Sequence, residues 1–524
     1  MRINRAPIGS GRRPDASRRA PIPLLALGAL AALVAVLPFF YLADRAIERG
    51  WSATWDELWQ RRTWDLIVRS VALTTVVTVM CVLIGVFAAV LIARTDLPGR
   101  RMWHSLLVIP LAVPSYLAAY AWVAARPSLA GFWGAALVLT TVSYPYVYLP
   151  VATALRRVDP ALEEMARSLG RSRARSLLVS VQQVRATISA GALLVALYVS
   201  SDFGAVATMR YEAFTWVIYG AYRAGFNPTR AAVLALVLVA LATVLVVAES
   251  YARGAASRLT TSRAGREGRR VALGSAATGI ATVFMVGVSA VSVGFPIASF
   301  GYWLSRGAAR DVAASDVMSA FAATMGVSAL AAVATVLLAL PVGLLAARHR
   351  SPLVTALERS TYIAHALPGI VIAISMVYVG VKVLEPIYLR TPLLVLAYAV
   401  LFLPLAVGST RAAIEQSPRQ LEDVARSLGR TRWGTWRDVT APLAAPGIAA
   451  GAALVMVTAM KELPITLLLH PTGMETMSMA VWKHTAVSDY ANAAPYAVAL
   501  ITSAILPTIA LSRLVAHDRR GTMS

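Results

Sequence analysis

The chain has 524 residues, of which 58% are hydrophobic and only 14% are charged. Soluble globular proteins carry about 25% charged residues, so this composition excludes an ordinary soluble fold and indicates a protein embedded in lipid. The formal net charge is +23, but no soluble stretch is long enough to form a nucleic-acid-binding domain, so no nucleic-acid partner is expected. The single cysteine, Cys81, lies in an apolar run, which excludes an internal disulfide.

Runs of about 20 mostly apolar residues indicate membrane-spanning helices, because a helix satisfies its own backbone amides within hydrocarbon. The first run follows a basic tail and is too long for the apolar core of a cleaved signal peptide, so we expect an uncleaved span. The sequence predicts an all-α polytopic membrane protein of about 12 transmembrane helices. They lie near 22–43, 69–93, 104–125, 132–155, 188–209 and 231–252, and near 271–300, 321–347, 360–382, 392–410, 447–469 and 495–513.

The positions of Lys and Arg predict the orientation, because short cytoplasmic loops retain basic residues. With the N-terminus inside, the cytoplasmic segments hold 34 of the 49 basic residues. We therefore expect a multi-pass protein of the bacterial cell (inner, or plasma) membrane with both termini in the cytoplasm. This asymmetry explains the net charge without any nucleic acid.

An internal repeat divides the chain into two halves. The segment LEEMARSLGR, which starts at Leu162, recurs as LEDVARSLGR, which starts at Leu421, an offset of 259 residues. Each half holds six expected spans, an even number, so both repeated segments face the cytoplasm. Two parallel six-helix repeats related by an axis along the membrane normal are predicted.

Both repeated segments predict a short amphipathic helix with an apolar stripe and a charged face. The stripes are Leu162, Met165, Ala166 and Leu169, and Leu421, Val424, Ala425 and Leu428. The charged faces are Glu163, Glu164 and Arg167, and Glu422, Asp423 and Arg426. One such helix would most often lie on the membrane surface. The same specific residues in two equivalent places instead favour docking of a protein dimer beneath the two halves.

Capping residues delimit both of these helices. Asp159 before Pro160, and Ser417 before Pro418, are typical of an N-cap followed by proline at the first helical position. Gly170 and Gly429 fit the left-handed position that ends a helix. A sharp turn is therefore expected after each helix.

The repeated loops resemble those of type I ABC importer permeases, whose pattern is EAA, three residues, G, nine residues and I-x-L-P. The second copy matches this pattern with Asp423, Val424, Ala425, Gly429, Val439, Ala441 and Pro442. The first copy matches with Glu164, Met165, Ala166 and Gly170, but has Ser180, Gln182 and Gln183 in place of I-x-L-P. This departure leaves the exit geometry of the first loop open.

The resemblance implies that each loop is a coupling helix, which fits a groove in a separate ATP-hydrolysing subunit. The residues expected at this contact are Glu163, Glu164, Ala166, Leu169, Gly170, Glu422, Asp423, Ala425, Leu428, Gly429 and Pro442. The sequence contains no GxxxxGK[ST] phosphate-binding loop. We therefore expect a transport subunit without a catalytic site or cofactor, with two ATPase subunits and an extracytoplasmic substrate-binding protein as partners.

The resemblance and the repeat together predict the domain boundaries. In chain order, we expect a cytoplasmic tail at 1–21, a first half at 22–252 with its type-1 core at about 66–252, a cytoplasmic linker at 253–270, a second half at 271–515 with its core at about 318–513, and a cytoplasmic tail at 516–524.

Two fused halves in one chain are similar to the iron(III) and thiamine permeases of this family. The segments SDFGAVATMRYEAFTWVIYGAYRAGFNPTRAA from Ser201 and KELPITLLLHPTGMETMSMAVWKHTAVSDYANAAP from Lys461 look like those that follow the coupling loop in ferric-iron permeases. Ferric iron is therefore the favoured substrate. Thiamine, or another small solute such as a polyamine or a phosphonate, is the alternative.

Charged residues inside the membrane are costly, which makes Asp202, Lys461 and Glu462 candidates for the translocation path. Pro464 and Gly204 lie beside them and would interrupt the helices. The alternative is that Lys461 and Glu462 neutralise each other, or cap a helix end near the outer interface. The histidines are too scattered for a metal cluster, so no metal site is expected.

A secondary transporter of the major facilitator type is the main rival, because it also has twelve spans in two parallel repeats. Its characteristic loop after the second span is matched only partly by RTDLPGRRMWH from Arg94. Its large loop also lies between the halves and not between spans four and five. No metal-ligand pair or nucleophile motif supports a membrane enzyme. The sequence favours an importer permease that works by ATP-driven alternating access.

Overall fold

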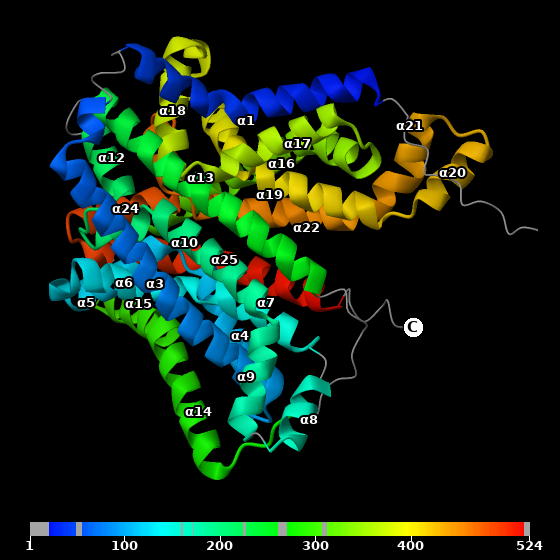
Figure 1. Cartoon of the computed structure of the whole chain (residues 1–524). Coiled ribbons are helices and arrows are strands. Elements are labelled where there is room, and N and C mark those ends of the chain that lie inside the picture. Colours follow the sequence, from blue (N-terminus) through cyan, green and yellow to red (C-terminus); the bar gives the residue numbers. More distant parts are fainter. Residues whose placement is uncertain are drawn as a thin grey trace, which may run out of the picture.

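The computed structural model describes residues 20–48, 55–158, 161–170, 172–223, 227–259, 270–306 and 312–517. Over these ranges the chain is helical, and its only extended pairing is an isolated bridge between Thr95 and Val271. The prediction of an all-α polytopic membrane protein is confirmed (Figure 1).

The first half contains α1 (Ile22–Glu48), α3 (Arg61–Arg94), α4 (Arg100–Val108), η1 (Ile109–Ala112), α5 (Ser115–Ala125), η2 (Pro127–Leu129), α6 (Phe132–Ser143), α7 (Pro145–Leu155), α8 (Ala161–Ser168), α9 (Arg173–Gln183), α10 (Arg185–Ser201), α11 (Gly204–Thr208), α12 (Phe214–Arg223) and α13 (Pro228–Leu259). The second half contains α14 (Ser275–Ser289), η3 (Ala290–Gly294), α15 (Phe295–Ser305), α16 (Ala314–Arg348), α17 (Pro352–Ile363), η4 (Ala364–Ala366), α18 (Gly369–Lys382), η5 (Glu385–Ile387), α19 (Thr391–Gln416), α20 (Arg419–Ser427), α21 (Arg432–Thr435), η6 (Trp436–Thr440), α22 (Ala441–Met460), α23 (Pro464–Leu469), α24 (Met477–Ala486) and α25 (Tyr490–His517).

The number of uninterrupted spans is smaller than the twelve expected. Within the described residues, eight helices are long and apolar enough to cross a bilayer, or up to ten if each of two bent pairs counts as one span. The expected span 104–125 is the more sharply bent pair, with 94° between its two parts. The span expected at 360–382 contains only a 14-residue apolar helix, α18.

Proline and charged residues cause the interruptions, and they do so at equivalent places in the two halves. Pro114 and Pro368 have extended backbone and precede α5 and α18, because proline has no amide to continue a helix. The expected span 188–209 breaks at Asp202, between α10 and α11. The expected span 447–469 breaks between Met460 and Pro464, so that α22 and α23 are separate helices.

Three packed helices form the centre of each half. In the first half α3 packs against α7 and α10, and in the second half α16 packs against α19 and α22. Buried side chains from both halves join in one apolar core. The repeat seen in the sequence is therefore also a repeat of helix packing.

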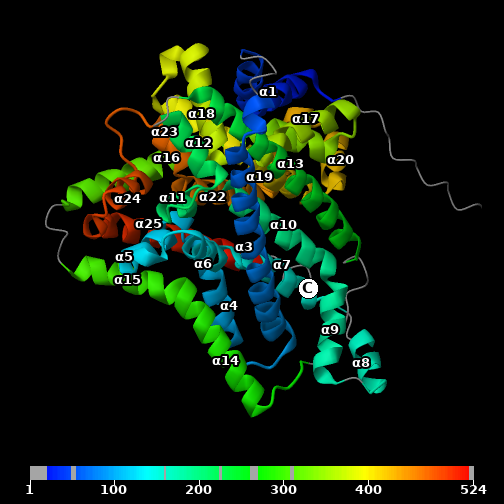
Figure 2. The same ribbon diagram turned by 60° about the vertical axis from the view of Figure 1, so that its left-hand side comes forward.

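The first helix of each half packs against the other half (Figures 1 and 2). Helix α1 lies against α16, α17 and α18, where the rings of Tyr41 and Tyr378 are in tilted contact with centroids 5.3 Å apart. In return, α14 and α15 lie against α4 and α5, where the rings of Trp122 and Phe295 stack at 3.8 Å. The halves are thus held together by a reciprocal exchange of helices.

Candidate functional site

A cavity of about 240 Å³ lies between the two halves, where the helices are interrupted. All four residues proposed for the path from the sequence line it: Asp202, Lys461, Glu462 and Pro464. The rest of the wall comes from residues beside the breaks at Pro114 and Pro368, and from α6, α7, α10, α19 and α22. Residues that are far apart in the sequence therefore meet at one site.

Asp202 ends α10 and caps the half-helix that follows it. One carboxylate oxygen accepts a hydrogen bond of 2.8 Å from the backbone amide of Ala205. The other accepts a bond of 2.5 Å from the hydroxyl of Ser115, which begins α5. The backbone carbonyl of Asp202 accepts a bond of 2.6 Å from Thr215. The side chain thus satisfies backbone groups that the interruption leaves without helical partners.

Glu462 performs the same task in the second half. Its carboxylate accepts a hydrogen bond of 3.2 Å from the backbone amide of Ile465, in the first turn of α23. Gly369 stands where Ser115 stands in the first half, and a Cβ atom there would lie 2.9 Å from the Glu462 carboxylate. Glycine therefore provides room for the longer glutamate side chain.

Lys461 connects the two halves across the cavity. Its ammonium group donates a hydrogen bond of 2.9 Å to the backbone carbonyl of Leu111, in η1 of the first half. Among the described residues it forms no direct ion pair with Glu462, although both side chains line the same cavity. Glu462 does cap a helix, and that helix begins at the wall of the cavity.

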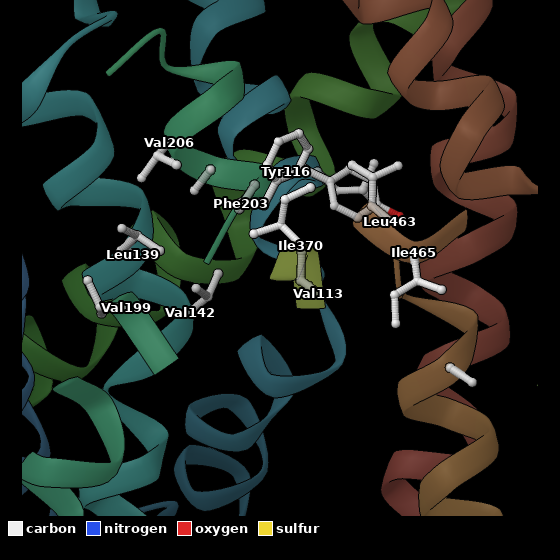
Figure 3. Close-up of a cluster of buried hydrophobic side chains, with 14 of the residues drawn as sticks. Val113, Tyr116, Leu139, Val142, Val199, Phe203, Val206, Ile370, Leu463 and Ile465 are labelled. Atoms are coloured by element: carbon white, nitrogen blue, oxygen red, sulfur yellow. The ribbon is translucent and has the colours of Figure 1, made fainter. Parts of the chain in front are cut away.

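Apolar side chains from both halves meet beside the cavity (Figure 3). Val113, Tyr116 and Phe203 come from the first half, and Ile370 and Leu463 from the second. All five are buried. The halves therefore meet at this cluster through apolar contacts.

The repeated amphipathic helices are α8 and α20, and they lie at the same end of the molecule (Figure 1). The expected apolar stripe divides into two parts. Ala166 and Ala425 are buried against the protein, whereas the larger side chains of the stripe that the structure describes are exposed. Leu169 and Leu428, at its ends, are 78% and 79% exposed. An exposed leucine therefore stands at the same place in both copies.

Glu163 was expected on the exposed charged face of the first helix, but it is 1% exposed. It forms a buried ion pair with Arg94, at the end of α3. The hydroxyl of Ser180 donates a hydrogen bond of 2.9 Å to the same carboxylate. This contact fixes α8 to a long helix of its own half.

Glu422 occupies the same position in the second half and is likewise buried, at 7% exposed. Its partners are Arg348 at the end of α16, 2.6 Å away, and the hydroxyl of Thr440, which donates at 3.0 Å. Glu163 and Glu422 therefore position the two helices, and the outward acidic residues are Glu164 and Asp423. The expected contact role of Glu163 and Glu422 is corrected accordingly.

The caps predicted for the ends of these two helices are confirmed only in part. Gly170 and Gly429 have φ of +79° and +85°, so the predicted left-handed positions are confirmed. The predicted N-cap at Ser417 is wrong, because α20 begins at Arg419 and the Ser417 hydroxyl has no hydrogen-bond partner among the described residues. The proposed cap at 159–160 lies outside the described residues.

The two loops return to the membrane differently. The first continues through α9 into α10 with a bend of 67° at Val184. The second passes through α21 and the wide turn η6 directly into α22, with Pro442 exposed in the first turn of that helix. The departure from the family pattern in the first copy therefore coincides with a kink.

Comparisons with known proteins identify the family. Residues 339–521 match the model described as "Binding-protein-dependent transport system inner membrane component". The Fe(3+)-transport system permease protein FbpB 2 of Haemophilus influenzae is 34% identical over 503 residues, covering 95% of this chain and 99% of that protein. The chain belongs to the permease family of binding-protein-dependent ABC importers.

Shorter relatives align with about one third of the permease. A putative ABC transporter permease of Streptomyces antibioticus is 33% identical over 35% of this chain and 79% of that protein. A probable molybdenum ABC transporter permease of Haloferax volcanii is 29% identical over 34% of this chain and 72% of that protein. These matches agree with a permease built from two related halves.

Several site residues of the permease were missed in the sequence. Arg94 and Arg348 each end a long helix, and Ser180 and Thr440 each lie 22 residues before Asp202 and Glu462, respectively. That regular spacing was a usable signal, because it repeats in both halves. Ser115, by contrast, carries no signal, because a serine in an apolar span is ordinary.

We predict that Glu163→Gln and Glu422→Gln each lower the midpoint of thermal unfolding of the purified permease. Each change leaves a buried arginine without its counter-charge, and breaking a buried ion pair in this way costs about 3–5 kcal/mol. The neighbouring exposed residues provide matched controls, because Glu164→Gln and Asp423→Asn should leave the midpoint unchanged.

An apolar replacement of both partners distinguishes the ion pair from a general packing effect. Arg348→Met combined with Glu422→Leu should recover most of the midpoint lost in Glu422→Gln, because no unpaired charge remains. Equal midpoints for Glu422→Gln and Asp423→Asn would show that the buried pair does not hold α20.

Proposed function

We propose that this permease carries ferric iron across the bacterial inner membrane by ATP-driven alternating access. The observation that carries the proposal is the pairing of Asp202 and Glu462, which come from the two halves and line one cavity between them. A site divided between two bodies can be exposed to either side of the membrane when those bodies rock against each other.

The chemistry of the cavity wall supports a hard metal cation as cargo. The oxygen-bearing side chains that line it include two carboxylates, several hydroxyls and several phenols, from Asp202, Glu462, Ser115, Ser201, Thr458, Tyr116, Tyr146 and Tyr198. Hard cations prefer such oxygen ligands to nitrogen and sulfur. The similarity to a protein named as an Fe(3+)-transport permease supports the same cargo.

A lysine in the wall supports a second class of cargo. Lys461 brings a positive charge to the cavity, which suits an oxyanion, and one relative is named as a probable molybdenum permease. Two carboxylates oppose this charge, and that relative aligns with only 34% of the chain. Iron is therefore the cargo that we favour over molybdate and over thiamine, a polyamine or a phosphonate.

The expected partners fit opposite ends of the molecule. Two ATPase subunits would contact α8 and α20, whose exposed leucines form equivalent surfaces. We place these helices and both termini in the cytoplasm, and the substrate-binding protein at the opposite end, near α12 and α24 (Figure 1). ATP hydrolysis then belongs to the separate subunits, and the permease only transmits their movement.

The buried ion pairs supply the mechanical link in this mechanism. Glu163 ties α8 to the end of α3, and Glu422 ties α20 to the end of α16. Because α3 and α16 pack along the central helices of their own halves, movement of a coupling helix moves its half as a body. The apolar contact beside the cavity would open or close with that movement.

We predict that Leu169→Asp together with Leu428→Asp abolishes co-purification of the ATPase subunit with the tagged permease. Charge at both exposed leucines should prevent burial against a partner, while the fold remains intact because neither side chain is packed. The matched control is Val487→Asp, an equally exposed apolar residue at the opposite end. Undiminished co-purification by the double variant would contradict the assignment of the coupling surface.

We predict that Asp202→Asn together with Glu462→Gln reduces uptake of radioactive ferric iron at least tenfold while leaving the unfolding midpoint nearly unchanged. An amide oxygen still accepts the capping hydrogen bond, so the substitution removes the charge and keeps the local structure. Glu212→Gln removes an exposed carboxylate outside the cavity and should have no effect. Uptake is measured in cells, normalised to permease abundance.

The outcomes of this experiment distinguish a ferric-iron cargo from an oxyanion cargo. Full iron uptake by the double variant would exclude the two carboxylates from the path. Saturable uptake of molybdate that Lys461→Gln abolishes, with no uptake of iron by the unaltered protein, would replace iron with an oxyanion as the cargo.

A further inference from the structure

A second cavity, of about 1240 Å³, lies at the end of the molecule that carries α20. It is bounded by the end of α16, the start of α17, the end of α19 and the start of α20. It is separate from the cavity between the halves, because the two share no lining residue. The proposed transport cycle uses one of its lining residues, Arg348, which pairs with Glu422, and gives the space itself no role.

Positive charge dominates the wall of this cavity. The basic residues that line it are Arg348, His349, Arg350, Arg359, Arg411 and Arg419, and the acidic ones are Glu358 and Glu415. Both glutamates form ion pairs with Arg411, so that their charge is already balanced within the wall. Arg350 and Arg359 form no ion pair with any described residue and are exposed. The cavity therefore has an excess of uncompensated guanidinium groups.

Three buried polar atoms in the wall have no hydrogen-bond partner in the part of the chain that the structure describes. They are Nε of Arg348, Nδ1 of His349 and the hydroxyl oxygen of Ser417. Buried polar groups normally have partners, and each group left without one costs about 1–3 kcal/mol. All three can donate a hydrogen bond, which is the arrangement that an acceptor-rich anion satisfies.

We propose that this cavity binds the phosphate group of an anionic ligand. Guanidinium groups match phosphate geometry through paired hydrogen bonds, and several of them around one space favour phosphate over a single carboxylate. Burial, together with the nearby Arg432 and Arg419, lowers the pKa of His349. A bound phosphate would counteract this lowering of the pKa and favour the protonated ring, in which both nitrogens of His349 donate hydrogen bonds.

The surroundings of the cavity suit a phospholipid headgroup. On helix α17 the side chains of Leu353 and Ile363 are 55% and 48% exposed. The long apolar helix α1 packs against the same helix. An acyl chain could lie along these residues while the headgroup enters the cavity. Clusters of arginine at the cytoplasmic side of membrane helices bind anionic headgroups in this way. Free phosphate could form the same hydrogen bonds with the guanidinium groups, but it has no acyl chain to contact the exposed apolar residues.

The test uses the full-length permease, purified in neutral detergent, and follows the midpoint of its thermal unfolding. Dioleoylphosphatidylglycerol, dioleoylphosphatidylcholine and inorganic phosphate are titrated separately. The variant is Arg350→Gln with Arg359→Gln, which removes two exposed, unpaired charges and does not disturb packing. The matched control is Arg61→Gln with Arg62→Gln, two exposed arginines at the start of α3.

We expect phosphatidylglycerol, but not phosphatidylcholine, to raise the midpoint. The half-saturating concentration should be about thirtyfold higher for Arg350→Gln/Arg359→Gln, since each arginine near an anionic surface contributes about 1 kcal/mol, and unchanged for the control. Stabilisation by inorganic phosphate with the same dependence on these arginines would support the site with free phosphate as its ligand.

Two results would overturn the proposal. One is equal midpoints with phosphatidylglycerol, phosphatidylcholine and no addition, together with no effect of phosphate. The other is an unchanged lipid titration in the variant while co-purification of the ATPase subunit is lost, which would make the cavity a protein contact.

Discussion

Hydrocarbon offers no hydrogen-bond partner to a peptide group, and this constraint governs both the helices of the permease and the places where they stop. At each interruption the protein must satisfy the freed amides itself. Asp202 and Glu462 do so by capping the half-helices that follow them. The groups that repair the backbone are thereby placed at the boundary between the halves, where they also face the cavity. The same two carboxylates therefore cap helices and line the cavity.

A few specific contacts connect this cavity to the end of the molecule that carries α8 and α20. The ion pairs of Glu163 and Glu422 join the short helices α8 and α20 to long helices that run through each half. The exchange of α1 and α14 between halves keeps the two bodies together while they move. These ion pairs thus lie within each half, whereas the halves meet beside the cavity through apolar side chains and the hydrogen bond from Lys461.

The sequence predicted the features that periodicity and repetition encode. The all-α class, the repeated amphipathic helices, the left-handed Gly170 and Gly429, and the gathering of Asp202, Lys461 and Glu462 at one site all followed from local patterns. The continuity of four spans did not, because hydropathy averages over a window and is insensitive to one proline or one charge. Burial of Glu163 was also missed, since its arginine partner lies 69 residues away in the sequence.

The central claim is that one cavity between the halves is open to opposite sides of the membrane in turn. Thr458 lines this cavity, and the native Cys81 is fully buried, so a Thr458→Cys variant offers one reactive thiol. Its modification by a membrane-impermeant reagent is measured from each side, in vesicles containing the ATPase subunits and the binding protein. The account predicts that ATP switches the side from which the thiol is modified. Modification from one side only, with or without ATP, would contradict it.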